Sequence, residues 1–307
     1  MSVLPASHVS AFKSLGGEAA FLTAYDAAMS RWPVPYEAID VPTRFGPTHV
    51  VISGPRDAPP LVLLHGYQAT LTMWAPNVAD FARAFRVYAI DVMGQPGRSV
   101  PTDPIRTAAD VVAWLTATLD GLRLGRISLI GMSYGGWVAL SYAIATPARI
   151  EKLVLLSPGG IYPLTTQFKL RGMLMVLLPT RFTVNSMMRW LGFANGAGQE
   201  DSRPVLDLMY LGLKHFRIPP ETLRVVPAAA PDDALRGLQM PVLLLIGANE
   251  AIYDPAEAVA RARRLVPHVH VDLIPGASHD MCVTQHEIVD RRVLEFLAQP
   301  SLPASAG

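Results

Sequence analysis

The chain has 307 residues, 50% of them hydrophobic, and one cysteine, Cys282. This length and hydrophobic content suffice for one large α/β domain or two medium ones with a sizeable core. The 26 basic and 25 acidic residues give a formal net charge of +1, so the composition shows no electrostatic footprint for nucleic acid or an anionic membrane. A lone cysteine excludes an internal disulfide and a thiolate metal cluster.

No segment at the start of the sequence combines a basic stretch with an apolar one, as a secretion signal would. The longest apolar runs, such as Val242 to Ile246, are too short to cross a bilayer. We therefore expect a cytoplasmic protein with no stable membrane association.

The N-terminal part predicts helices followed by an edge hairpin. Apolar residues from Ser10 to Arg31 recur at a loosely helical period that a glycine pair interrupts, which predicts one or two helices. Extended segments at 37–41 and 48–52, punctuated by prolines, predict antiparallel edge strands. Residues 61–64 are a fully apolar strand, typical of a parallel sheet that is buried on both faces.

Helices and strands then alternate, which indicates a parallel sheet. Thr107 with Asp110 three residues later resembles a capping box and supports a helix start. The expected elements are a helix at 74–84, a strand at 86–91, a helix at 107–122, a short strand that begins at 127 and the helix that follows it, a strand at 152–157, and, after an interruption, a strand at 242–246, a helix at 255–265, a strand at 269–274 and a helix at 285–297.

The interruption runs from about Ile161 to Arg236, is helical in pattern, and is rich in methionine and aromatic residues. We interpret it as an inserted lid. Most of its apolar side chains are expected to pack against the core, and some to line a cavity. A membrane-surface role for Gly172 to Leu178 is an alternative for part of this segment.

One short pattern predicts a reactive serine. Within residues 127–136 a short apolar strand runs into Gly131-Met132-Ser133-Tyr134-Gly135, a G-x-S-x-G sequence followed by a helical pattern. In such an elbow the serine occupies a strained turn, the small residues let strand and helix pass closely, and the hydroxyl is left exposed. The alternative is a tight turn whose serine only makes a hydrogen bond, which the flanking strand and helix disfavour.

Four landmarks recur along the chain: His65-Gly66, the elbow, Gly247-Ala248-Asn249-Glu250 and Gly276-Ala277-Ser278-His279. In this order and at these intervals they resemble the α/β-hydrolase fold superfamily, and more narrowly its carboxylesterase-like members with a helical cap. The resemblance covers roughly residues 35–298. Two features depart from the family pattern: the loop at 91–99 is one residue longer than the usual D-x-x-G-x-G-x-S, and the acid position holds Glu rather than Asp.

The resemblance implies a mostly parallel eight-stranded sheet flanked by helices, with an inserted helical cap. We expect an N-terminal helical segment at 1–34, a hydrolase core at 35–158 and 237–298, a cap at 159–236 and a C-terminal tail at 299–307.

Ser133, an acid and His279 follow one another in the chain order expected of this fold. A neutral serine needs an imidazole to take its proton, and the imidazole needs a carboxylate to orient it and stabilise its charged form. Glu250 occupies the acid position of the motif, and Asp254, four residues later, is the alternative. The resemblance also implies an oxyanion hole formed by the backbone N–H groups of Tyr67 and Tyr134.

Other histidines suggest no second site. By analogy with the family, His65 is expected to brace the oxyanion loop. His268, His270 and Asp272 alternate along one strand and could share a face, but no fourth metal ligand is evident. We therefore predict no metal and no cofactor.

The expected reaction is acyl transfer to water: hydrolysis of a small to medium, fairly apolar ester by a carboxylesterase-type serine hydrolase. The alternatives on the same residues are a lactonase, a thioesterase, a carbon–carbon bond hydrolase and a cofactor-free perhydrolase. A more remote alternative is a receptor that binds a small molecule under the lid. The sequence leaves the oligomeric state open.

Overall fold

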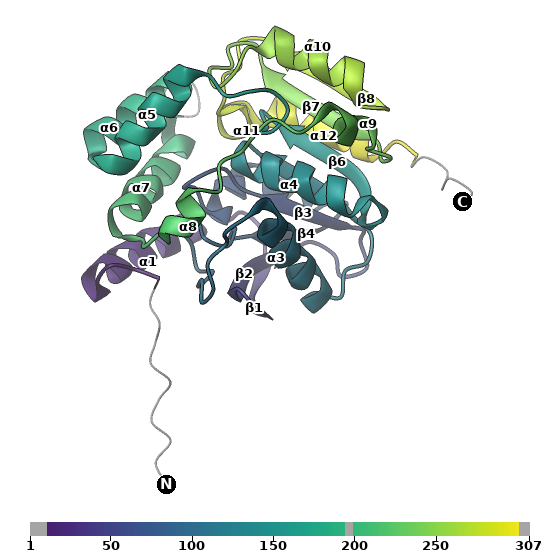
Figure 1. The fold of residues 1–307 in the computed structure, drawn as a ribbon. Coiled ribbons are helices and arrows are strands. Elements are labelled where there is room, and N and C mark those ends of the chain that lie inside the picture. The colour runs from purple at the N-terminus through teal and green to yellow at the C-terminus, as the bar shows by residue number, and fades with distance from the viewer. Residues whose placement is uncertain (1–10, 194–198, 301–307) are drawn as a thin grey trace.

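The computed structural model describes residues 11–193 and 199–300, and an eight-stranded sheet forms its centre (Figure 1). The strand order is β1-β2-β4-β3-β5-β6-β7-β8. The pairs β1–β2 and β2–β4 are antiparallel and the others parallel, which confirms the predicted edge hairpin and mostly parallel sheet. The strands are β1 (Tyr36–Thr43), β2 (Gly46–Ser53), β3 (Pro60–Leu64), β4 (Arg86–Ile90), β5 (Ile127–Met132), β6 (Ile150–Leu156), β7 (Val242–Gly247) and β8 (Val269–Ile274).

Helices cover both faces of this sheet. The helices are α1 (Leu15–Met29), α2 (Ala75–Phe81), α3 (Ala108–Gly121), α4 (Tyr134–Ala145), α5 (Thr166–Leu177), α6 (Arg181–Trp190), α7 (Gln199–His215), α8 (Pro220–Leu223), α9 (Asp232–Arg236), α10 (Pro255–Leu265), α11 (Met281–Thr284) and α12 (His286–Leu297), with 3₁₀ turns η1 (Leu71–Trp74) and η2 (Pro147–Arg149). Figure 1 shows α3 and α4 nearer the viewer than the strands and α12 beyond them. The short α11 was not predicted.

The N-terminal region contains one helix within residues 11–34, where the sequence predicted one or two helices. Ser14 caps α1, and its hydroxyl accepts a hydrogen bond of 3.1 Å from the N–H of Gly17. The glycine pair therefore lies in the first turn and does not interrupt the helix. Gly17 faces His215 at the end of α7, where a side chain would not fit. Ser10, at which the helical pattern was predicted to begin, lies outside the described residues.

The capping box at Thr107 is present as predicted. The Thr107 hydroxyl accepts a 3.1 Å hydrogen bond from the Asp110 N–H, and the Asp110 carboxylate accepts a 3.0 Å bond from the Thr107 N–H. These bonds satisfy two backbone groups that would otherwise lack partners at the start of α3.

Helices α5 to α9 lie between β6 and β7 in the chain. Figure 1 shows α5, α6 and α7 together at one side of the molecule, with α5 and α6 farthest from the sheet. Helix α7 packs against α1, α6 and α11. The domain limits at residues 34, 158, 236 and 298 stay predictions. Within the described residues, no helix combines the length and apolar character needed to cross a membrane.

The sheet positions the candidate site because its parallel strands end at one edge. Strands β5, β7 and β8 are parallel to one another through β6. The segments that follow them carry Ser133, Glu250 and His279, respectively. Open α/β sheets bind ligands beyond the carboxyl ends of their strands, so these three side chains share the edge at which a substrate is expected.

A buried carboxyl group that is not part of this candidate site, Asp290, lies on α12. The Asn77 side-chain amide donates a 2.7 Å hydrogen bond to Asp290 Oδ1 and a 2.9 Å bond to the Cys282 carbonyl. Burial raises the pKa of Asp290 to about 7; the Asn77 bond lowers it only partly, and the negative charge of Asp80 raises it further.

This raised pKa predicts that the protein loses stability as pH rises. An ordinary Asp loses its proton near pH 4, so between about pH 4 and 7 the folded chain holds a proton that the unfolded chain has released, and stability falls through this window. Asp290→Asn should therefore stabilise the fold at pH 8, by on the order of 2–4 kcal/mol, and by less at pH 5. Urea unfolding at both pH values, with the exposed Asp57→Asn as control, measures this difference. An equal change at the two pH values would contradict it.

Candidate active site

Ser133 occupies a strained turn between β5 and α4. Its φ of 52° and ψ of −111° place a non-glycine residue in a rarely populated backbone region. The flanking glycines make this turn sterically feasible: a Cβ on Gly131 would lie 2.2 Å from the Gly135 carbonyl oxygen, and one on Gly135 would lie 2.2 Å from the Leu64 carbonyl oxygen. The predicted strand, sharp turn and helix are therefore all present.

Gly135→Ala is expected to destabilise the fold by about 3 kcal/mol, because the added methyl group would collide with backbone that cannot move aside. Gly125→Ala is the matched control, since no heavy atom lies within 4 Å of the Cβ it would add, and its effect should stay within about 1 kcal/mol. Urea denaturation of both variants gives the comparison. Equal stabilities would contradict the close-packing argument.

His279 bridges the serine and a carboxylate. It lies between β8 and α11, with only 3% of its surface exposed. Its Nε2 lies 2.9 Å from Ser133 Oγ, and its Nδ1 lies 2.9 Å from Glu250 Oε2 and 3.1 Å from Oε1. Because a carboxylate only accepts, Nδ1 carries the proton, and Nε2 presents its lone pair to the serine hydroxyl.

Glu250 is held in place by its own loop. Its Oε1 accepts hydrogen bonds from the N–H groups of Ala251, at 2.8 Å, and Ile252, at 3.0 Å. Burial alone would raise the pKa of Glu250, but the charge and hydrogen bond of His279, together with the Ile252 N–H, outweigh it and hold the pKa below its usual value. The carboxylate is therefore ionised beside the imidazole.

Asp254, the alternative acid, has a different role in the structure. It is the N-cap of α10, and its Oδ1 accepts hydrogen bonds from the N–H groups of Ala256, at 2.9 Å, and Glu257, at 3.1 Å. Its side chain is exposed. The structure thus brings Glu250, and not Asp254, to His279.

The two predicted oxyanion-hole residues follow adjacent strands. Strands β3 and β5 pair in parallel, and Tyr67 and Tyr134 lie just beyond their ends, with ring centroids 5.9 Å apart. A Cβ on Gly66 would lie 3.7 Å from Ser133 Cβ, so this segment runs directly beside the nucleophile. This placement suits the predicted N–H donors, whose role remains a prediction.

His65 braces the same segment. It is fully buried; its Nδ1 lies 2.8 Å from the Gly66 carbonyl oxygen, and its Nε2 lies 2.9 Å from the Val92 nitrogen. Since the Val92 N–H donates to Nε2, the ring proton lies on Nδ1 and is donated to Gly66. Burial lowers the pKa of His65, which keeps the ring neutral and suited to both bonds.

Sequence reasoning missed how the lengthened loop at 91–99 supports the site. Gln95 Oε1 accepts a 3.0 Å bond from the N–H of Gln68, which adopts a positive φ of 59° directly after Tyr67. Asp91 accepts bonds from the Leu71 N–H, at 2.8 Å, and from the Tyr25 hydroxyl of α1, at 2.9 Å. The only sequence signal was the extra residue in this loop.

A contact between the inserted helices and the histidine loop was also missed. The His279 N–H donates a 3.1 Å hydrogen bond to the Leu191 carbonyl, just after α6. The next residue, Gly192, has a φ of +103°, and a Cβ there would lie 2.3 Å from Ser278 Cβ. The end of α6 therefore packs directly on the loop that carries the imidazole.

The remaining histidines form no metal site within the described ranges. His268 lies in a turn with a φ of 52°, and the His270 ring packs on Phe296 at a centroid distance of 5.7 Å. No group of three or more His, Cys, Asp or Glu residues within residues 11–193 and 199–300 is arranged to hold a metal ion.

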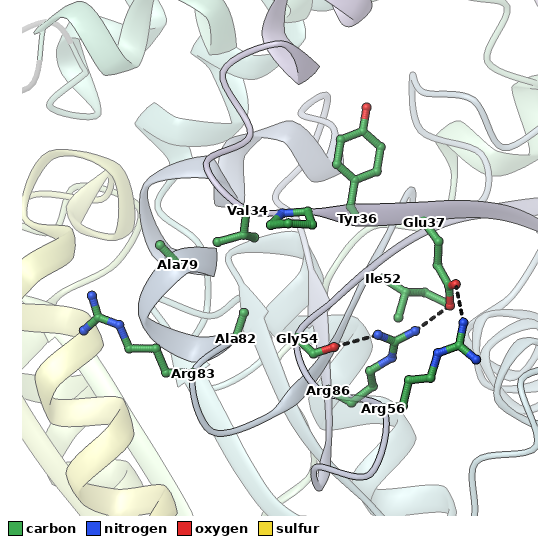
Figure 2. Close-up of a pocket in the computed structure, with 11 residues that line it drawn as sticks. Val34, Tyr36, Glu37, Ile52, Gly54, Arg56, Ala79, Ala82, Arg83 and Arg86 are labelled. Atoms are coloured by element: carbon green, nitrogen blue, oxygen red, sulfur yellow. Dashed lines mark hydrogen bonds and ion pairs between the residues drawn. The ribbon is translucent and has the colours of Figure 1, made fainter.

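A cavity of about 590 Å³ lies at the other edge of the sheet (Figure 2). It is lined by residues near the start of β4, including Arg86, whose guanidinium donates to the Gly54 carbonyl at 2.7 Å and pairs with Glu37 at 2.5 Å. No residue of the candidate site lines it. Because its central arginine already has these partners, this cavity has no evident part in the chemistry at Ser133.

A model of the alpha/beta hydrolase family matches residues 61–291, and the chain belongs to this family. Carboxylesterase YbfK of Bacillus subtilis (strain 168) is 33% identical over 285 residues, which cover 90% of this chain and 93% of that protein. The crystal structure of naproxen esterase (carboxylesterase NP) from Bacillus subtilis superposes with a TM-score of 0.86 at 30% identity, covering 93% of this chain and 99% of that one. The structure of carboxylesterase CesB (YbfK) gives a TM-score of 0.84 at 32% identity, covering 92% and 99%.

Proposed function

We propose that the chain is a carboxylesterase that hydrolyses small to medium, fairly apolar esters with Ser133, His279 and Glu250 as its catalytic triad. The observation that carries this proposal is the imidazole of His279, placed 2.9 Å from both the Ser133 hydroxyl and the Glu250 carboxylate. The similarity to carboxylesterases over nine-tenths of the chain supports the same class of reaction.

The reaction follows from this hydrogen-bonded chain. Nε2 of His279 takes the Ser133 proton as Oγ attacks the ester carbonyl carbon, and Glu250 stabilises the imidazolium that results. The backbone N–H groups of Tyr67 and Tyr134 would stabilise the oxyanion of the tetrahedral intermediate. The imidazolium then gives its proton to the leaving alcohol, and a water activated by the same ring releases the acid from the acyl-enzyme. No step requires a metal or a cofactor.

The test is a substrate panel run on the wild-type chain. We expect p-nitrophenyl esters of increasing acyl length to be hydrolysed, with a length preference that reports the size of the acyl site. Lactone, thioester and β-diketone substrates, with perhydrolysis as a further assay, represent the alternatives on the same residues. If the ester rates stay at background while one of these other substrates is turned over, the ester proposal is wrong.

A covalent probe separates an enzyme from a receptor. An alkyl phosphonate ester should add its phosphonyl group to Ser133 Oγ with loss of the leaving group, and peptide mass spectrometry would locate the added mass. Thermal stabilisation by a small ligand, with neither labelling nor turnover, would favour the receptor. A cytoplasmic location remains a prediction that cell fractionation would test.

A further inference from the structure

Helix α5 exposes a continuous apolar stripe. Leu170, Met173, Leu174 and Leu177 follow the i, i+3, i+4, i+7 spacing of a single helix face. Their exposed fractions are 56%, 55%, 50% and 68%, whereas Met175, on the inner side, is 3% exposed. A helix that is apolar on all sides is normally buried, so half of the apolar surface of α5 lacks a partner within the described structure.

The stripe continues beyond the end of α5. Leu178 and Phe182 are 57% and 75% exposed, so six of the thirteen large hydrophobic side chains that are exposed among the described residues lie within residues 170–182. Figure 1 shows α5 and α6 at the outer margin of the molecule. Contiguous exposed apolar surface marks an interaction site far more often than scattered residues do. We call these six residues, Leu170, Met173, Leu174, Leu177, Leu178 and Phe182, the cap face.

Helices α5 and α6, which carry most of the cap face, contain basic residues but no acidic ones. Helices α5 and α6 carry Lys169, Arg171, Arg181 and Arg189, and no Asp or Glu occurs from residue 152 to 199. Since the whole chain has a formal net charge of +1, the chain outside these two helices carries a formal net charge of −3. The near-neutral total therefore includes a locally basic segment at α5 and α6.

The basic residues differ in how far they are neutralised. Arg181 pairs with Asp207 at 2.6 Å. The Arg171 guanidinium lies over the Trp190 ring at 5.2 Å, and Lys169 and Arg171 form no ion pair within the part of the chain that the structure describes. At least two of the cations beside the apolar stripe thus remain available to an anionic partner.

We propose that the cap face docks reversibly on an anionic lipid surface. Leucine, methionine and phenylalanine side chains beside lysine and arginine match the boundary between acyl chains and negatively charged headgroups. A second copy of the chain fits less well, because joining two cap faces would bring their like charges together. Docking requires no catalysis, so the inference goes beyond the proposed esterase activity.

Docking would also orient the candidate site. The chain leaving α6 contacts the catalytic loop through Leu191 and Gly192, so the cap face and His279 are joined by one short segment. A docked molecule would therefore hold its candidate active site close to the lipid, where apolar esters concentrate.

The test is co-sedimentation of the full chain with vesicles of phosphatidylglycerol and, separately, of phosphatidylcholine. We expect tighter binding to phosphatidylglycerol, weakened by salt. Leu174→Asp combined with Leu177→Asp should weaken binding about tenfold or more, and Lys169→Glu should weaken it about tenfold. Leu15→Asp is the matched control, since Leu15 is 82% exposed on α1, outside the cap face, and it should bind as the wild type does.

Several outcomes would overturn the proposal. One is an absence of binding to phosphatidylglycerol, and another is equal binding by all the leucine variants. Analytical ultracentrifugation supplies a third: a concentration-dependent dimer, lost in the Leu174, Leu177 variant, would assign the cap face to a second copy. Ser133→Ala should bind vesicles as the wild type does, so failure of the esterase proposal and failure of docking are distinguishable.

Discussion

Replacing Ser133 by alanine is expected to lower kcat for a p-nitrophenyl ester by about 10⁶-fold. The substitution removes the oxygen that lies 2.9 Å from His279 Nε2, and with it the only group placed to form the acyl-enzyme in the proposed mechanism. His279→Ala should cost about as much, because without the imidazole the serine keeps its proton.

The two substitutions should also be non-additive. A nucleophile and its base act as one unit, so the double variant is expected to be no slower than either single variant by more than about tenfold. Steady-state kinetics on one ester, with thermal unfolding to verify the fold, give the comparison. Activity in Ser133→Ala within about tenfold of the wild type would contradict the nucleophile assignment.

Glu250→Gln is expected to lower kcat by about 10⁴-fold. The amide would be uncharged, and its NH₂ group would face Nδ1, which favours the wrong ring tautomer and leaves the imidazolium without its counter-charge. Because the pKa of Glu250 lies below its usual value, the wild-type carboxylate is charged at neutral pH, and the loss should be present at pH 7 and above.

Asp254→Asn is the matched control for this substitution. It changes a carboxylate to an amide on the same loop, and asparagine caps helices about as well as aspartate, so α10 should keep its N-cap. We expect kcat to stay within about twofold of the wild type. A larger loss in Asp254→Asn than in Glu250→Gln, measured with the same ester, would transfer the acid role to Asp254.

Short-range patterns in the sequence were enough to predict most of the fold. The elbow around Ser133 was recognisable because its backbone admits only small residues at Gly131 and Gly135, where a Cβ would meet backbone 2.2 Å away. The buried strands were recognisable because strands covered on both faces are apolar throughout. The mostly parallel sheet, the edge hairpin and the capping box at Thr107 follow from such local rules, and the structure confirms them.

These short-range patterns could not predict contacts between segments that are distant in the chain. Glu250 and Asp254 are both carboxylates on one loop, and only the folded path of that loop directs Glu250 to His279 while Asp254 caps α10. The catalytic roles of these residues stay predictions. In the same way, nothing near Tyr25 indicated that its hydroxyl would reach Asp91.

The cap face shows most clearly that short-range patterns do not determine how distant segments pack together. Helix α5 is apolar on two sides, so its periodicity cannot say which stripe is buried; the outward direction of Leu174 and Leu177 and the inward direction of Met175 appear only once the helix is packed. Local backbone geometry and burial thus restrict which residues can be neighbours in the sequence. For this reason the amino-acid sequence alone was enough to predict the fold and the sharp turn that holds Ser133. The choice of carboxylate and the orientation of α5 depend on contacts between residues far apart in the chain, and those are settled by packing.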